Sequence, residues 1–396
     1  MVKASKETIK QINRQNIINV FFKADTVSKS EVIEQTKLSP ATVNNIIQEL
    51  VDETLLLERH YGESSGGRRP MLYSLNAELY HVLAIKVSTK NVLSAVINLE
   101  GTIVASRTLL TTIHNEESLT EAISASISLL KEQDNALMDS INTVAFSIPG
   151  IMNYTHATVV YSAALYVENY DLKAVVQKHF KAGLPVRVYK DTDAMLLGEY
   201  HCGLSNCENM AFFLCENGVG LSVMNRNKLF WSDSCGMEIG HTVIDIHGKQ
   251  CKCGLRGCVS TLLGENRAIE RYIELNSEKT GQGTFDSSSL DYLTLYAMAD
   301  EGDSCSKEVI EEQIQLLALT LVNIVNLFNP TEVVLGGPLA RIDKIGETLN
   351  RIVQEKVLKP FAKNLSVRCS KLNINASLSG MAFDCIRKDF FKSIKF

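Results

Sequence analysis

One imidazole and three thiols lie within an 18-residue stretch of this chain, His241–x9–Cys251–x–Cys253–x4–Cys258. Nitrogen and sulfur ligands at this spacing suit a closed tetrahedral zinc site. The glycines between the last two cysteines permit tight backbone turns, which would let the sulfurs converge. The alternatives are a disulfide, or buried cysteines beside an unrelated histidine. We expect Zn2+ at these four residues, because clustered cysteines in intracellular proteins are more often metal ligands than cystines.

The composition of the 396-residue chain is that of a globular protein, with 45% hydrophobic and 21% charged residues. This length is enough for two or three domains. The net charge is only −5, and residues 1–80 carry ten basic and ten acidic side chains, so DNA binding would need a local basic patch. The N-terminus lacks the pattern of a signal peptide, and no apolar run is long enough to cross a membrane. We therefore expect a cytoplasmic protein without membrane contact.

The N-terminal part of the chain has the pattern of three short helices, expected over 6–24, 29–35 and 40–53. Ser39 is placed to cap the third helix, and Pro40 takes its first position, where the missing amide hydrogen costs nothing. This helix has one apolar face. Its polar face suits base edges in the major groove of DNA, although a merely solvated face is the alternative. The expected DNA contacts on it are Ser39, Ala41, Thr42, Asn44, Asn45 and Gln48.

Two strand-like runs, 55–59 and 71–75, follow the third helix and enclose a glycine-rich tip that carries Arg68 and Arg69. Arginines on such an arm favour phosphates or the narrow minor groove of DNA. A polar recognition helix followed by a basic hairpin predicts a winged helix-turn-helix DNA-binding domain over residues 1–78.

After residue 80 strands alternate with helices in two similar blocks, each of which begins with a three-strand meander. The expected strands are 82–87, 92–98, 103–109, 141–148 and 186–189, then 210–214, 220–224, 228–231 and 332–335. The expected helices are 116–131, 171–180, 194–201, 264–275, 288–300, 307–328 and 378–392. Two such blocks predict two related α/β lobes with a ligand between them. The helix over 307–328 would pack in the core or at a dimer interface.

Four segments carry a resemblance to a known family: Ser64–Pro70, Glu238–His241, Cys251–Cys258 and Asn329–Gly337. They resemble the ROK (repressor, open reading frame, kinase) family, in its branch of xylose and N-acetylglucosamine repressors. The resemblance implies an α/β, two-lobed actin/hexokinase-like (ribonuclease H-like) ROK domain over residues 79–396. Lobe one would span about 79–192 plus the C-terminal helix, and lobe two about 193–378. It also implies a sugar effector in the interlobe cleft, and a homodimer or tetramer that binds operator DNA.

Sugar kinases of this family carry an Asp-x-Gly-Gly-Thr loop that cradles phosphate. Its equivalent here is Lys86–Lys90, which lacks the aspartate and both glycines. The second phosphate loop has Glu216 beside it, and a carboxylate would repel a triphosphate. We therefore expect no enzyme and no catalytic residues, but a sugar-responsive transcriptional repressor of carbohydrate genes. The alternatives are a sugar kinase, or a regulator that responds to a protein partner.

By the same resemblance the effector would contact Asp191, Glu238, His241, Lys190 and Gly150. Asp191 aligns with the base of the kinases, but a carboxylate there can also accept a hydrogen bond from a sugar hydroxyl. Lys190 and Ala164 stand where sugar-binding members have asparagine. Lys190 either favours a phosphorylated or acidic sugar, or pairs with Asp191 or Asp193 and contacts no ligand. Trp231 would stack on a sugar or pack in the core.

Overall fold

The computed structural model describes residues 6–22, 24–63, 69–201, 207–216, 218–230, 237–280, 290–372 and 374–390. The chain divides into two compact units. The first unit comprises Met1–Gly150, Ala157–Val188 and Met381–Phe396, and the second comprises Ile151–His156 and Tyr189–Gly380. Among the described residues, no helix is long and apolar enough to span a membrane.

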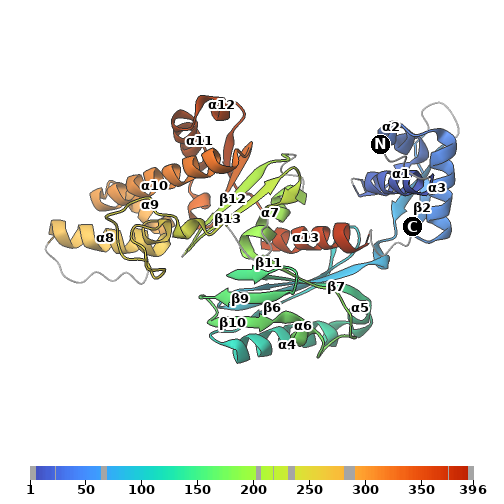
Figure 1. The fold of residues 1–396 in the computed structure, drawn as a ribbon, viewed down its shortest axis with the longest axis horizontal. Coiled ribbons are helices and arrows are strands. Elements are labelled where there is room, and N and C mark those ends of the chain that lie inside the picture. Colours follow the sequence, from blue (N-terminus) through green and yellow to red (C-terminus); the bar gives the residue numbers. More distant parts are fainter. Residues whose placement is uncertain are drawn as a thin grey trace. The chain divides into compact units, whose positions relative to one another are not determined.

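The first unit begins with a module of three helices and a small antiparallel sheet (Figure 1). The helices are α1 (Lys6–Phe21), α2 (Lys29–Thr36) and α3 (Pro40–Asp52). The strands β1 (Val27–Ser28), β2 (Leu56–Tyr61) and β3 (Met71–Leu75) pair in the order β1-β3-β2. The Ser39 hydroxyl accepts a hydrogen bond from the Thr42 amide and caps α3, as the sequence predicts. The apolar face of α3 is buried, which leaves its other face to solvent.

The five-stranded sheet of the first unit has the order β11-β7-β4-β5-β6. Its strands are β4 (His81–Val87), β5 (Asn91–Ile97), β6 (Ile103–Leu110), β7 (Ile141–Ile148) and β11 (Val186–Lys190). β4 pairs antiparallel with β5 and parallel with β7. α4 (Glu116–Gln133) packs on β5 and β6.

The sheet of the second unit repeats this connectivity, with the order β14-β13-β12-β15-β16. Its strands are β12 (Met210–Cys215), β13 (Val219–Asn225), β14 (Lys228–Leu229), β15 (Glu332–Gly336) and β16 (Ser366–Cys369). In each unit a three-strand antiparallel meander is extended by two further strands beside its first strand. The structure therefore shows two related α/β blocks, as the alternating pattern predicts.

Different helices cover the two faces of the second sheet, because successive side chains of a strand point to opposite sides. Leu221 and Val223 of β13 lie in a core that also contains buried residues of the helices α8 (Glu265–Thr280), α9 (Tyr292–Asp300), α10 (Ser304–Phe328) and α11 (Ile345–Lys356). Gly220 and Ser222 instead contact Thr192 of α7 (Asp191–His201). α10 is thus largely a core helix in this unit.

Several elements differ from the sequence-based expectation. α7 begins at Asp191, three residues before the expected start, with two aspartates in its first turn, where the helix dipole favours anions. α6 (Leu172–Val176) is shorter than expected. The last helix, α13 (Ile374–Cys385), begins earlier and continues as a π-helix over Ile386–Phe390. Elements that the pattern did not indicate are α5 (Asn135–Asp139), β8 (Ile151–Asn153), β9 (Thr158–Ser162), β10 (Val167–Asp171), α12 (Lys359–Ala362), α11 and β16.

The crossing of α7 and α13 depends on Gly198 and Gly380. A Cβ on Gly380 would lie 2.2 Å from the Gly198 backbone nitrogen, closer than any real contact. We expect Gly380→Ala to lower the free energy of unfolding by about 2 kcal/mol, because rigid backbone must move apart. Gly346→Ala in α11 is the matched control, since its nearest contact would be 3.3 Å. Urea unfolding of both variants checks this, and equal losses would contradict it.

Candidate metal centre and effector site

A loop between β14 and α8 carries the four metal-ligand candidates. It contains two short 3-10 turns, Ile239–His241 and Val259–Thr261. Ile239 and Val259 are buried in the core of the second unit and anchor both ends of the loop. The Val259 amide donates to the Thr242 carbonyl at 2.9 Å, so the two ends lie side by side. The loop is therefore fixed to the core around the ligands.

Gly257 is required by the path of this loop. Its φ is +66°, and a Cβ there would lie 1.4 Å from the Asp245 carbonyl oxygen. The Gly257 carbonyl accepts from the Ile244 amide at 2.9 Å, which ties the cysteine turn to the segment after His241. A residue with a side chain would push these two segments of the loop apart, so Gly257 is needed to hold Cys258 close to His241.

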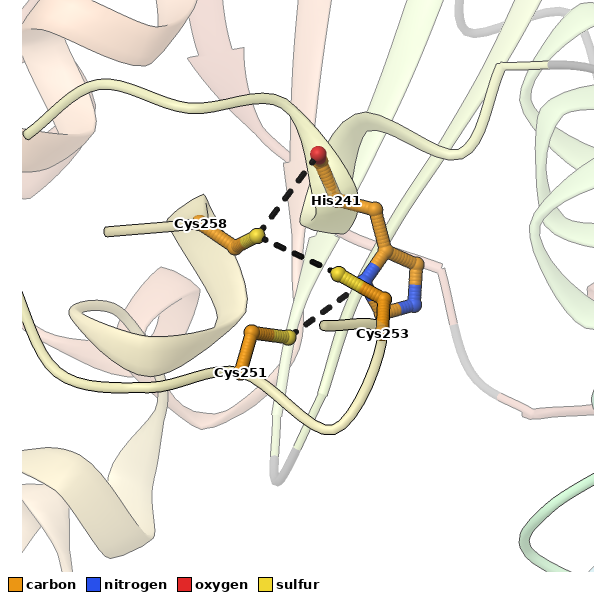
Figure 2. Close-up of side chains that lie close together, drawn as sticks. All are labelled: His241, Cys251, Cys253 and Cys258. Carbon is orange, nitrogen blue, oxygen red and sulfur yellow. Dashed lines mark hydrogen bonds between the residues drawn. The ribbon is translucent and has the colours of Figure 1, made fainter. Parts of the chain in front are cut away.

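The four ligand atoms converge with the spacing of a tetrahedral site (Figure 2). His241 Nδ1 lies 3.6 Å from Cys251 Sγ, and Cys253 Sγ lies 3.6 Å from Cys258 Sγ. All four atoms lie within 4.8 Å of one another. Zinc with bonds of about 2.3 Å to sulfur and about 2.0 Å to nitrogen places its ligands roughly 3.5–3.8 Å apart. The residues therefore fit a zinc ion, and the sulfurs are not joined as a disulfide.

The thiols of the cluster strongly influence one another. Burial raises the pKa of Cys258 to about 12, and the neighbouring sulfurs of Cys253 and Cys251 add to the rise. Burial also acts on Cys251, but hydrogen bonds from Cys253 and His241 outweigh it and lower the pKa of Cys251 to about 6. Without a cation the cluster thus resists full ionisation, and a bound metal ion would favour all three thiolates.

We expect the purified protein to contain about one zinc per chain without added metal. Cys258→Ser should abolish the bound metal and lower the melting temperature, because Cys258 is fully buried between the other ligands. Cys305→Ser is the control, since Cys305 is equally a buried free cysteine but lies outside the cluster. Metal analysis by mass spectrometry gives the answer. A metal-free protein that folds normally would exclude the site.

Of the expected effector residues, Lys190 and Glu238 are brought together directly. Lys190 Nζ lies 3.1 Å from Glu238 Oε1. Lys190 ends β11, and Glu238 stands three residues before the ligand His241, so this contact joins the β11–α7 junction to the metal loop. The sequence left Lys190 as an anion-binding group or as the partner of a neighbouring aspartate. In the described part of the chain its ammonium group lies beside a third carboxylate, that of Glu238, while Asp193 also feels its charge.

Asp193 is a buried residue of this region whose importance the sequence did not reveal. It accepts hydrogen bonds from the hydroxyls of Ser222 and Tyr154, and from the Lys190 amide. Burial raises its pKa, while the Ser222 hydrogen bond and the Lys190 charge act against the rise. Asp191, at the first position of α7, is only partly buried. Asp193 therefore stabilises the Lys190 backbone from the buried side, whereas Asp191 lies closer to solvent.

Gly150 lies in the first unit and closes the turn after β7. Its φ is +130°, and a Cβ would lie 2.4 Å from the Tyr161 carbonyl oxygen, so the turn itself requires glycine. Ala164 is exposed in the same unit. Trp231 and Arg68 lie outside the described residues. The expected effector role of Gly150 stays a prediction.

The polar face of α3 is open to solvent. Ser39, Ala41, Asn44, Asn45 and Gln48 are exposed, and Thr42 is partly buried beside the cap. Gln48 Nε2 donates to Asp52 at 2.9 Å. Arg14, on α1, pairs with Glu49 and Glu53 and so fixes the other side of the helix. Arg69 is exposed after the hairpin tip.

The model of the ROK family matches residues 82–387, which is most of the chain. The chain belongs to the ROK family. The match begins at β4, so the N-terminal module precedes the ROK domain.

Two relatives and one solved structure extend over nearly the whole chain. An N-acetylglucosamine repressor of Escherichia coli O6:H1 is 25% identical over 380 residues, with 95% of this chain and 93% of the relative covered. A xylose repressor of Caldicellulosiruptor bescii is 25% identical over 380 residues, with 94% of each covered. The crystal structure of a ROK family transcriptional regulator, a homologue of the E. coli Mlc protein, has a TM-score of 0.80 at 23% identity and covers 97% of each chain.

Proposed function

We propose that this protein is a sugar-responsive transcriptional repressor of carbohydrate uptake or catabolism genes. The observation that carries the proposal is an exposed polar helix face in a module placed before a ROK domain. Residues 1–78 form a winged helix-turn-helix, and residues 79–396 form the effector-binding domain. The protein acts as a homodimer, because one small, electrically balanced module would bind a single half-site weakly.

The DNA-binding role rests on the division of α3 into two faces. Val43, Ile46 and Ile47 are buried, so the helix is held in the module and its polar side is presented as a rigid surface. Asn44, Asn45 and Gln48 can each form paired hydrogen bonds with adenine in the major groove. The exposed Arg69, with Arg68 beside it in the sequence, supplies charge for phosphates.

The effector role rests on Glu238, Asp191 and His241. Carboxylates accept hydrogen bonds from sugar hydroxyls, and Glu238 is exposed. Zinc bound at the ligand loop would supply a fixed orientation for the His241 ring. An effector that binds one conformation of the protein more tightly shifts the population and thereby changes operator affinity.

The first phosphate loop of a kinase is replaced by a closed turn. The Ser88 hydroxyl accepts hydrogen bonds from the amides of Asn91, at 3.1 Å, and Lys90, at 3.4 Å. The Ser88 amide donates to the Asn91 carbonyl at 2.9 Å. These amides are used within the turn, whereas phosphate binding needs them directed at the ligand. This arrangement favours a sensor over a phosphoryl-transfer enzyme.

Kinase activity is tested by ATP consumption with a panel of hexoses, pentoses and N-acetylhexosamines. We expect the wild-type rate to equal that of Asp191→Asn, because the turn after β4 offers no phosphate cradle. Sugar-dependent ATP hydrolysis that Asp191→Asn abolishes would establish a kinase.

Operator binding is tested with a duplex selected in vitro from random DNA. We expect the double variant Arg68→Ala, Arg69→Ala to bind at least about tenfold more weakly at 100 mM salt, with a shallower dependence on salt, since two phosphate contacts are lost. The exposed Arg107 of β6 gives the control variant Arg107→Ala, which should bind normally. Unchanged binding of the double variant would contradict the basic wing.

A further inference from the structure

The ion pair of Lys190 and Glu238 joins a shielded cation to an accessible carboxylate. The Lys190 side chain is 8% exposed, and the Glu238 side chain is 42% exposed. An ammonium group that has lost most of its water needs close carboxylates, and removing Glu238 would take away one of the negative charges that balance it. Glu238 therefore holds Lys190 in place while its own outer edge still faces solvent.

Carboxylates outnumber this cation in its immediate surroundings. Asp193 lies behind Lys190, accepts a hydrogen bond from its amide and feels its charge. Asp191 follows Lys190 directly at the start of α7. A zinc ion with three thiolates and one neutral imidazole would carry a net charge of about −1, so the proposed metal does not reverse the balance. The acidic groups exceed the charge that Lys190 neutralises.

A ligand at such a site must bring hydrogen-bond donors. Ionised carboxylates accept hydrogen bonds but donate none, and sugar hydroxyl or ammonium groups meet this need. A phosphate ester or sugar acid brings further acceptors and negative charge. Such an anionic group could pair with Lys190 only by displacing the Glu238 carboxylate, which would then lose its cation.

We propose that the Lys190–Glu238 ion pair selects an uncharged or amine-bearing sugar as the effector, and excludes the anionic group of a sugar phosphate or sugar acid from this cluster. This selectivity rests on the proposed function, because it concerns the same effector site. Lys190 is thus a specificity-determining residue that acts by neutralising Glu238.

The first test compares matched ligands on the full-length, metal-loaded protein by calorimetry. The series are glucose, glucosamine, glucuronate and glucose 6-phosphate, and the corresponding forms of xylose and N-acetylglucosamine. We expect the uncharged or amine-bearing forms to bind at least about tenfold more tightly than the anionic forms. Tighter binding of an anionic form, lost in Lys190→Met, would overturn the proposal.

The second test uses inorganic phosphate and does not depend on the identity of the sugar. Glu238→Gln keeps the shape of the side chain but removes one negative charge beside Lys190, so phosphate should bind this variant at least about tenfold more tightly than wild type. Lys190→Met added to Glu238→Gln should remove the gain. The exposed pair Lys249–Glu274 provides the control, and Glu274→Gln should leave phosphate binding unchanged.

The outcomes distinguish a failure of the proposed function from a failure of the ion-pair proposal. If no sugar changes the melting temperature or operator binding, the proposed function fails, and the phosphate titration still decides the role of the ion pair. A Glu238→Gln variant that binds zinc and unfolds cooperatively but gains no phosphate binding overturns the ion-pair proposal alone. If Lys190→Met does not fold, Lys190→Gln replaces it in both tests.

Discussion

Three thiols and one imidazole held within 4.8 Å of one another form the interaction on which the ligand loop depends. Ionising such thiols together is unfavourable, which the raised pKa of Cys258 reflects. A cation bound among them would remove that cost, and loop geometry and metal binding would then support each other. The loop is anchored to the core by Ile239 and Val259, so the same packing that stabilises the second unit also positions His241 and Glu238.

Strand alternation determines what lies behind the candidate effector residues Lys190 and Glu238. Leu221 and Val223 face the helical core, so Ser222 faces α7 and reaches Asp193. Asp193 in turn accepts the Lys190 amide, and the Lys190 side chain extends to Glu238. A buried carboxylate network thus fixes a lysine whose charge is balanced by an accessible glutamate, and a small change in one partner would alter the charge of the whole site.

In the ROK domain, the sheets and the turn after β4 play different roles. The same sheet order occurs in both units, and four candidate metal ligands lie together. The turn after β4, however, uses the amides of Lys90 and Asn91 for the Ser88 hydroxyl. One serine thus satisfies two amides of the turn locally, without disturbing the strands on either side.

Local sequence determined much of this protein. Periodicity, capping and cysteine spacing depend on near neighbours. They predict the strands of both meanders, the Ser39 cap, the buried face of α3 and the cluster of four candidate metal ligands. The short strands β8–β10 and β16 were missed, because short strands gain their stability from tertiary partners. The helix α11 could have been predicted, since its buried residues Ile345, Leu349, Ile352 and Val353 recur with the period of a helix. Only the tertiary structure decided that Lys190 pairs with Glu238, 48 positions away in sequence, and that Asp193 is buried beneath it. A charged side chain can reach several carboxylates, and the fold alone determines which one is close and shielded from water.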